Sequence, residues 1–77
     1  MRVAFTARAW KHYSYWLEND PRMAERIRAL IDASRRSPFS GVGKPEPLRN
    51  EFKGWWSRRI TDEHRLVYRI TGSGDDQ

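Results

Sequence analysis

The segment at residues 35–47 constrains the fold of this chain more than any other feature. It holds three prolines and two glycines, which are Pro38, Pro45, Pro47, Gly41 and Gly43. Neither a helix interior nor a strand interior tolerates this composition, because proline lacks a backbone donor and glycine favours turns. We therefore expect a long loop between a helical first part and a strand-like second part. A long loop in a compact domain is usually functional.

The residues before this loop begin with a short strand and a helix. Residues 1–5 are interpreted as a first strand, and Thr6 can then cap a helix over residues 7–19. The apolar stripe of this helix is expected at Trp10, Tyr13, Ser14 and Leu17, with Trp16 beside it.

A second helix follows almost at once. Asp20 is a good N-cap and Pro21 suits the first helical position, where its missing N–H costs nothing. The helix is expected to end near Ser34, with an apolar stripe of Met23, Ile27, Leu30 and Ile31. The two helices should form an antiparallel hairpin.

The residues after the loop predict strands. Residues 48–52, 55–60 and 64–71 are strand-like, and residues 61–63 suit a hairpin turn. The fold class is therefore α+β: one domain over residues 1–77, with an antiparallel sheet packed against an N-terminal helical hairpin. Residues 72–77 are interpreted as a truncated turn or tail.

The charge of the chain indicates its partners. Fifteen basic and ten acidic residues give a net charge of +5, and twelve of the cations are arginine, which grips phosphate with paired hydrogen bonds. Residues 35–69 hold nine basic and four acidic residues, interleaved with Trp55, Trp56 and Tyr68. Cations beside aromatic faces favour single-stranded RNA. An ordinary solvated basic face is the alternative.

Cysteine is absent, and no apolar run approaches the ~20 residues of a membrane span. We therefore expect a cytoplasmic protein with no membrane partner.

The pairing register of the last two strands predicts which of their side chains share a face of the sheet. If Arg59 lies opposite Arg65, both guanidinium groups leave the same face of the sheet. Like charges directly opposite one another are destabilising, so such a pair suits a bound anion. The same register puts Arg58 on the other face, near Leu66.

Glu46 lies between Pro45 and Pro47, which hold it on a stiff backbone suited to a general base. Pairing with a nearby cation is the alternative. His64, next to Arg65, is the acid that the raw sequence offers near the site, or else a turn residue. His12 lies mid-helix, where a packed or surface role fits better. No metal-ligand cluster is present, and we expect no metal and no cofactor.

Three spaced motifs resemble one family. The sequences GKPEPL at residues 43–48, GWWSRRI at 54–60 and EHRLVY at 63–68 strongly resemble the YoeB toxins of bacterial toxin–antitoxin systems, which have a RelE-like fold. The resemblance covers essentially residues 1–71.

This resemblance implies a ribosome-dependent endoribonuclease that cuts mRNA in the A site and so inhibits translation. It implies catalytic roles for Glu46 and Arg65, contact of Arg59 with the scissile phosphate, and no acid role for His64. The basic residues expected to bind RNA are Lys44, Arg49, Lys53 and Arg58. The implied partners are a YefM-like antitoxin, the ribosome with its mRNA, and a second copy in a homodimer.

One departure from the family is expected to matter. YoeB-like chains carry a further strand with a His-Tyr pair, and this sequence stops at Gln77 before it. The chain is therefore expected to bind better than it cuts. Two alternatives stay open, namely a non-catalytic module that binds ribosome or antitoxin, and a metal-dependent nuclease.

Overall fold

The computed structural model describes residues 3–71. The expected turn or tail at residues 72–77 therefore lies outside the described residues, as do Met1 and Arg2. In the described part of the chain, neither helix is long and apolar enough to cross a membrane.

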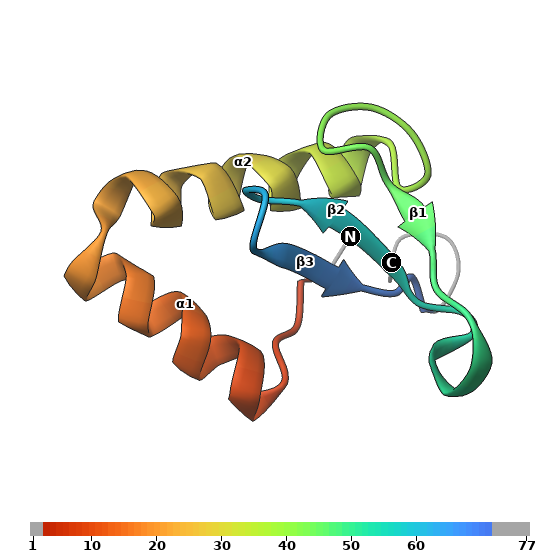
Figure 1. Cartoon of the computed structure of the whole chain (residues 1–77), viewed down its shortest axis with the longest axis horizontal. Coiled ribbons are helices and arrows are strands. Elements are labelled where there is room, and N and C mark those ends of the chain that lie inside the picture. The colour runs from red at the N-terminus through yellow and green to blue at the C-terminus, as the bar shows by residue number, and fades with distance from the viewer. Residues whose placement is uncertain (1–2, 72–77) are drawn as a thin grey trace.

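Two capped helices form the first half of the fold (Figure 1). Helix α1 spans Ala7–Asn19 and helix α2 spans Pro21–Arg36. The Thr6 Oγ1 accepts a hydrogen bond from the Ala9 N–H at 3.0 Å, and the Asp20 Oδ1 accepts one from the Met23 N–H at 3.3 Å. The two predicted N-caps are confirmed, and they set where the helices begin.

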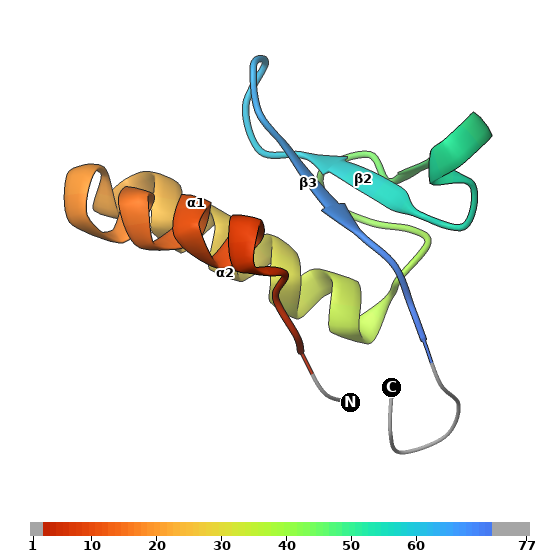
Figure 2. The same cartoon turned by 90° about the horizontal axis from the view of Figure 1, so that it is seen from below.

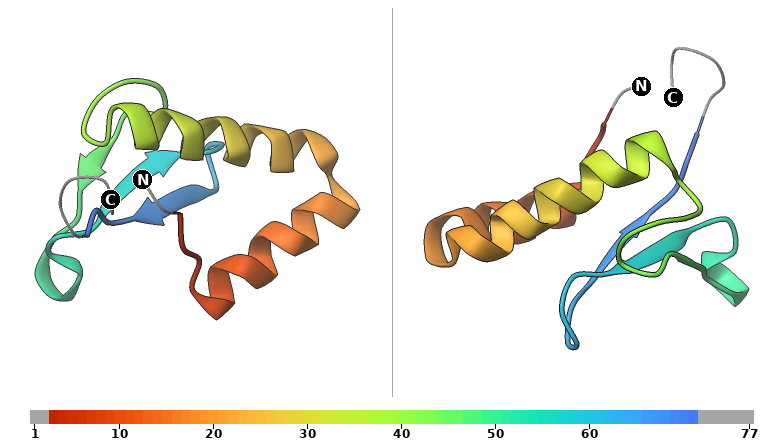
Figure 3. Two further views of the ribbon diagram at one scale, coloured as in Figure 1. Left: turned by 180° about the vertical axis from the view of Figure 1, so that it is seen from behind. Right: turned by 90° about the horizontal axis from the view of Figure 1, so that it is seen from above.

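Three antiparallel strands form the second half. They are β1 (Glu46–Pro47), β2 (Trp56–Arg59) and β3 (Arg65–Tyr68), and β2 lies in the middle of the sheet. The helices lie to one side of this sheet (Figure 2 and Figure 3). The predicted α+β class with a helical hairpin against an antiparallel sheet is thus confirmed.

The core lies between α2 and the sheet. Its buried apolar residues are Met23, Ile27, Leu30 and Ile60. Tyr13 and Trp16 of α1 and Leu66 of β3 are half-buried and pack against them. The predicted stripe of the second helix is confirmed, with Ile31 at its half-buried edge. The helix-facing side of β3 is therefore the side from which Leu66 projects.

The predicted apolar stripe of α1 is confirmed only in part. Trp10 and Leu17 are exposed, whereas Tyr13 and Trp16 reach the core. Trp10 instead lies 5.4 Å from the ring of Phe5, edge to face. Aromatic packing with the segment before the helix replaces the expected core contact.

Two predicted strands are wrong in the described residues. Residues 3–5 belong to no strand, and residues 48–52 do not form one. Strand β1 comes earlier, and a 3₁₀ turn at Asn50–Phe52 follows it. Asn50 has φ +59°, a left-handed conformation that asparagine tolerates and that interrupts an extended strand. The loop that was predicted to reach residue 47 therefore ends before Glu46, which is the first residue of β1.

Candidate active site on the open face of the sheet

The strand register places a carboxylate and two arginines on one face of the sheet. Glu46 of β1 pairs with Ser57 of β2, and Arg59 of β2 pairs with Arg65 of β3. Directly paired residues share a face, and so do residues two apart in one strand. Glu46, Ser57, Arg59 and Arg65 therefore project from the same face. The predicted Arg59–Arg65 register is confirmed.

This face is the one turned away from the helices. Leu66 is in the core and alternates with Arg65, so Arg65 and its face-mates point to the other side. Glu46, Arg59 and Arg65 are all exposed. The three side chains are therefore accessible to a partner as large as RNA.

Arg65 leans across the central strand. Its Nη1 donates a hydrogen bond of 3.4 Å to the Oγ of Ser57, which is 2% exposed. Ser57 is the pairing partner of Glu46, so this contact directs the Arg65 guanidinium toward the carboxylate-bearing strand. Ser57 was not predicted as a site residue, although its period-two spacing from Arg59 could have indicated it.

Among the described residues, no cation neutralises Glu46. Within residues 3–71 its carboxylate forms no ion pair, so the alternative that it pairs with a nearby cation has no support there. An unpaired carboxylate can accept a proton from a substrate hydroxyl.

The two arginines face each other across β2 and β3, and within residues 3–71 no ion pair bridges them. The Arg59 Nη1 lies 3.9 Å from the Asp62 Oδ1, but that aspartate side chain is 98% exposed, so the pair contributes little. Opposed like charges are unfavourable in a bare sheet and favourable around an anion. The arrangement can hold a phosphate.

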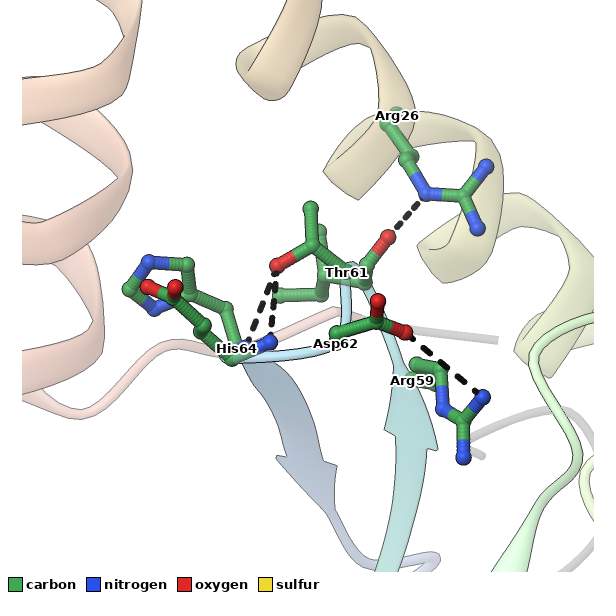
Figure 4. A network of polar contacts seen from close by, with 7 residues as sticks. Arg26, Arg59, Thr61, Asp62 and His64 are labelled. Carbon is green, nitrogen blue, oxygen red and sulfur yellow. Dashed lines mark hydrogen bonds and ion pairs between the residues drawn. The ribbon is translucent and has the colours of Figure 1, made fainter.

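His64 turns toward the helices (Figure 4). Its ring lies 5.4 Å from that of Trp16, edge to face, and it lines a hollow with His12, Tyr15 and Trp16. The Thr61 Oγ1 fixes the turn by accepting the backbone N–H of His64 at 3.2 Å. The structure therefore does not bring His64 to the face that carries Arg65. His12, on α1, lines the same hollow as His64.

The predicted RNA-binding role of Arg58 needs correction, because this residue does not lie on the surface that RNA could reach. Its side chain is 0% exposed, and it donates hydrogen bonds to Tyr68 and to backbone carbonyls of the loop. Its expected role in RNA binding conflicts with this burial. Arg58 lies on the helix-facing side of the sheet because side chains alternate along β2, and the loop between α2 and β1 covers it there.

The other three expected RNA-binding residues are exposed. Lys44 lies just before β1, and Arg49 and Lys53 flank the 3₁₀ turn. The Arg69 guanidinium stacks on the Trp55 ring at 4.8 Å. This cation–π pair places an aromatic face beside the basic segment, and Arg69 was not among the predicted site residues.

Within residues 3–71, no three His, Asp or Glu side chains lie close enough together to hold a metal ion.

Two helices on one face of a three-stranded antiparallel sheet, with a carboxylate and paired arginines on the other, define a small α+β domain of RelE-like type. The family described as "YoeB-like toxin of bacterial type II toxin-antitoxin system" matches residues 5–76. The chain belongs to this family.

Individual relatives agree with this assignment. Toxin YoeB of Streptomyces coelicolor is 52% identical over 77 residues, which are 100% of this chain and 88% of that protein. The solved structure of a YoeB/ParE toxin from Agrobacterium tumefaciens has a TM-score of 0.95 at 51% identity, covering 97% of this chain and 85% of that one.

Two solved structures from Staphylococcus aureus show how relatives assemble. One is a YoeB dimer and the other a heterotetrameric YoeB–YefM toxin–antitoxin complex. Each has a TM-score of 0.87 at 38% identity and covers 92% of this chain and 83% of that chain.

Proposed function

We propose that this toxin is an endoribonuclease that cleaves mRNA in the ribosomal A site without a catalytic metal and so stops translation. The observation that carries the proposal is the open face of the sheet, where exposed Glu46 accompanies the opposed Arg59 and Arg65. Metal-independent cleavage of a phosphodiester uses a base and cations of this kind, together with a source of a proton for the leaving oxygen.

Each group has a defined task in the proposed reaction. Glu46 takes the proton of the ribose 2′-hydroxyl, and the 2′-oxygen then attacks the adjacent phosphorus. Arg59 and Arg65 stabilise the extra negative charge on the phosphoryl oxygens. The bond from phosphorus to the 5′-oxygen breaks, which leaves a 2′,3′-cyclic phosphate and a 5′-oxygen that must gain a proton.

The source of that last proton limits the rate. The histidines of this sequence are His12 and His64, and both line the hollow on the helix-facing side. Neither histidine is therefore placed to protonate the leaving oxygen, and cleavage without a general acid is typically slower by about 10²–10⁴-fold. We therefore expect slow cleavage by the 77-residue chain.

The RNA is expected to run beside β1. Exposed Lys44, Arg49 and Lys53 supply phosphate contacts, and Trp55 with Arg69 supplies a stacking surface. Because the substrate is ribosome-bound mRNA, we place the protein in the cytoplasm.

The proposed protein partners follow from the relatives. Since YoeB chains from S. aureus form a dimer and a complex with YefM, we propose that this chain dimerises and is neutralised by a YefM-like antitoxin. No membrane partner is proposed.

Cleavage on programmed ribosomes tests the proposed function. Purified ribosomes carrying an mRNA with a defined A-site codon are mixed with the 77-residue chain, or with that chain extended by the family's terminal His-Tyr strand. We expect slow A-site cleavage by the first and faster cleavage by the second. Failure of the extended chain to cut contradicts the proposal.

A non-catalytic module that binds ribosome or antitoxin is the second candidate, and the position of His64 favours it for this chain. It predicts ribosome binding with no cleavage by either form.

A further inference from the structure

The buried Arg58 has no role in the proposed reaction, yet its guanidinium donates several hydrogen bonds. Its Nη1 donates to the Val42 carbonyl at 2.8 Å, and its Nη2 donates to the carbonyls of Ser40, at 2.9 Å, and Ser37. Its Nε donates to the Tyr68 hydroxyl at 3.2 Å. Three of these acceptors are backbone oxygens of the loop between α2 and β1.

Burying a charged group is costly unless its hydrogen bonds are made. Arg58 is 0% exposed, yet among the described residues no buried side-chain nitrogen or oxygen lacks a partner. Arginine can satisfy several acceptors at once because its guanidinium is a rigid, planar fork, whereas lysine presents a single ammonium. The loop carbonyls thus converge on a group that only arginine supplies.

The loop is attached to the sheet at two further points. The Tyr68 hydroxyl, which accepts from Arg58, donates to the Pro38 carbonyl, so the beginning of the loop is held as well. The Arg59 backbone N–H donates to the Gly43 carbonyl at 2.7 Å. The loop from Ser37 to Gly43 is therefore held by the Arg58 guanidinium with its tyrosine partner, by the Gly43 carbonyl, and by the Phe39 ring, which lies 4.7 Å from that of Trp56.

Glu46 begins a strand of only two residues, three positions after Gly43. Such a short strand pairs with β2 at Glu46 and Pro47, so the loop before it contributes to where Glu46 lies. From this we infer that Arg58 is a positioning residue: it fixes the loop through its carbonyls and thereby holds Glu46 on the face that carries Arg65. This inference rests on the proposed function, because it assigns Glu46 the role of base.

The alternative is that Arg58 stabilises the whole domain and has no particular effect on Glu46. Amide hydrogen exchange distinguishes the two, because it reports opening segment by segment. The test compares Arg58→Lys with the matched control Arg28→Lys, an exposed arginine of α2. Tyr68→Phe is a milder second variant, which removes only the hydroxyl that joins Arg58 to Pro38.

We expect amide exchange in Arg58→Lys to rise about tenfold or more in residues 39–44 relative to α2, and a smaller rise of the same pattern in Tyr68→Phe. Arg28→Lys should leave both segments unchanged. A rise that is equal in loop and α2, or no rise in the loop, overturns the inference. If Arg58→Lys fails to fold, the exchange pattern of Tyr68→Phe decides in the same way.

The second readout is cleavage of ribosome-bound mRNA by the extended chain. A misplaced base should lower kcat on the order of 10²-fold and leave KM nearly unchanged, because the exposed RNA-binding residues remain. A loosened loop with unchanged kcat overturns the positioning role. If the extended chain without any substitution does not cut, the proposed function fails, and the exchange result still shows what holds the loop.

Discussion

At the scale of single residues, the site depends on charges that the fold leaves unneutralised. Arg59 and Arg65 face each other across β2 and β3, and Glu46 has no ion-pair partner within residues 3–71. The opposed arginines weaken an isolated fold, because like charges repel, and they become favourable when a phosphate lies between them. Removing one of these arginines should therefore raise the stability of the fold and weaken substrate binding.

The substitution Arg59→Gln tests whether stability and cleavage change in opposite directions. The substitution removes like-charge repulsion with Arg65 and loses only a weak contact with exposed Asp62. We expect the free energy of unfolding in urea to stay unchanged or rise by up to about 1 kcal/mol, while A-site cleavage falls. A loss of more than about 1 kcal/mol would show that Arg59 holds the fold together instead.

At the scale of elements, the helices were predictable and the first strand was not. Thr6, Asp20 and Pro21 are local signals, and they placed both helix starts correctly. Pairing of β2 with β3 followed from a short turn and alternation. The position of β1 could not be predicted in this way, because it depends on the left-handed conformation of Asn50 and on loop contacts between residues distant in sequence. The burial of Arg58 was missed for the same reason.

Gly43→Ala, with Gly54→Ala as control, tests how tightly the loop packs. Both glycines have positive φ, +85° and +96°, so both substitutions strain the backbone. A Cβ at Gly43 would lie 2.9 Å from the Leu30 Cδ2 and 3.1 Å from the Arg58 Cβ, whereas a Cβ at Gly54 has nothing within 4 Å.

We expect Gly54→Ala to cost about 1–2 kcal/mol and Gly43→Ala about 1–3 kcal/mol more, measured by urea unfolding. Equal costs for the two variants would mean that the loop does not pack against α2 and β2 as described.

At the scale of the whole molecule, the exposed basic residues of the described chain occur both around β1 and on the helices. Lys44 precedes β1 and Arg49 and Lys53 flank the 3₁₀ turn after it, whereas Lys11, Arg22 and Arg28 lie on the helices, and all six are exposed. If RNA follows the sheet, only the first group should release counterions on binding.

Replacing Lys44, Arg49 and Lys53 together with glutamine should weaken binding to single-stranded RNA. Each lost phosphate contact reduces the slope of log K against log salt by about 0.7, so the slope should become shallower by about 2. The matched triple variant at Lys11, Arg22 and Arg28 should keep the original slope. The same change in both triple variants would indicate binding through overall charge alone.

The central claim is that Glu46 is the base of an RNA-cleaving site on the open face of the sheet. Glu46→Gln keeps the shape of the side chain and removes its ability to accept a proton. Glu51→Gln makes the same change at an exposed carboxylate in the 3₁₀ turn and serves as the control.

Single-turnover cleavage of ribosome-bound mRNA by the extended chain is the most direct measurement. We predict that Glu46→Gln slows cleavage by about 10²–10⁴-fold, with unchanged binding to the ribosome, and that Glu51→Gln cuts at the original rate. Cleavage by Glu46→Gln at the same rate as the unsubstituted chain would contradict the account.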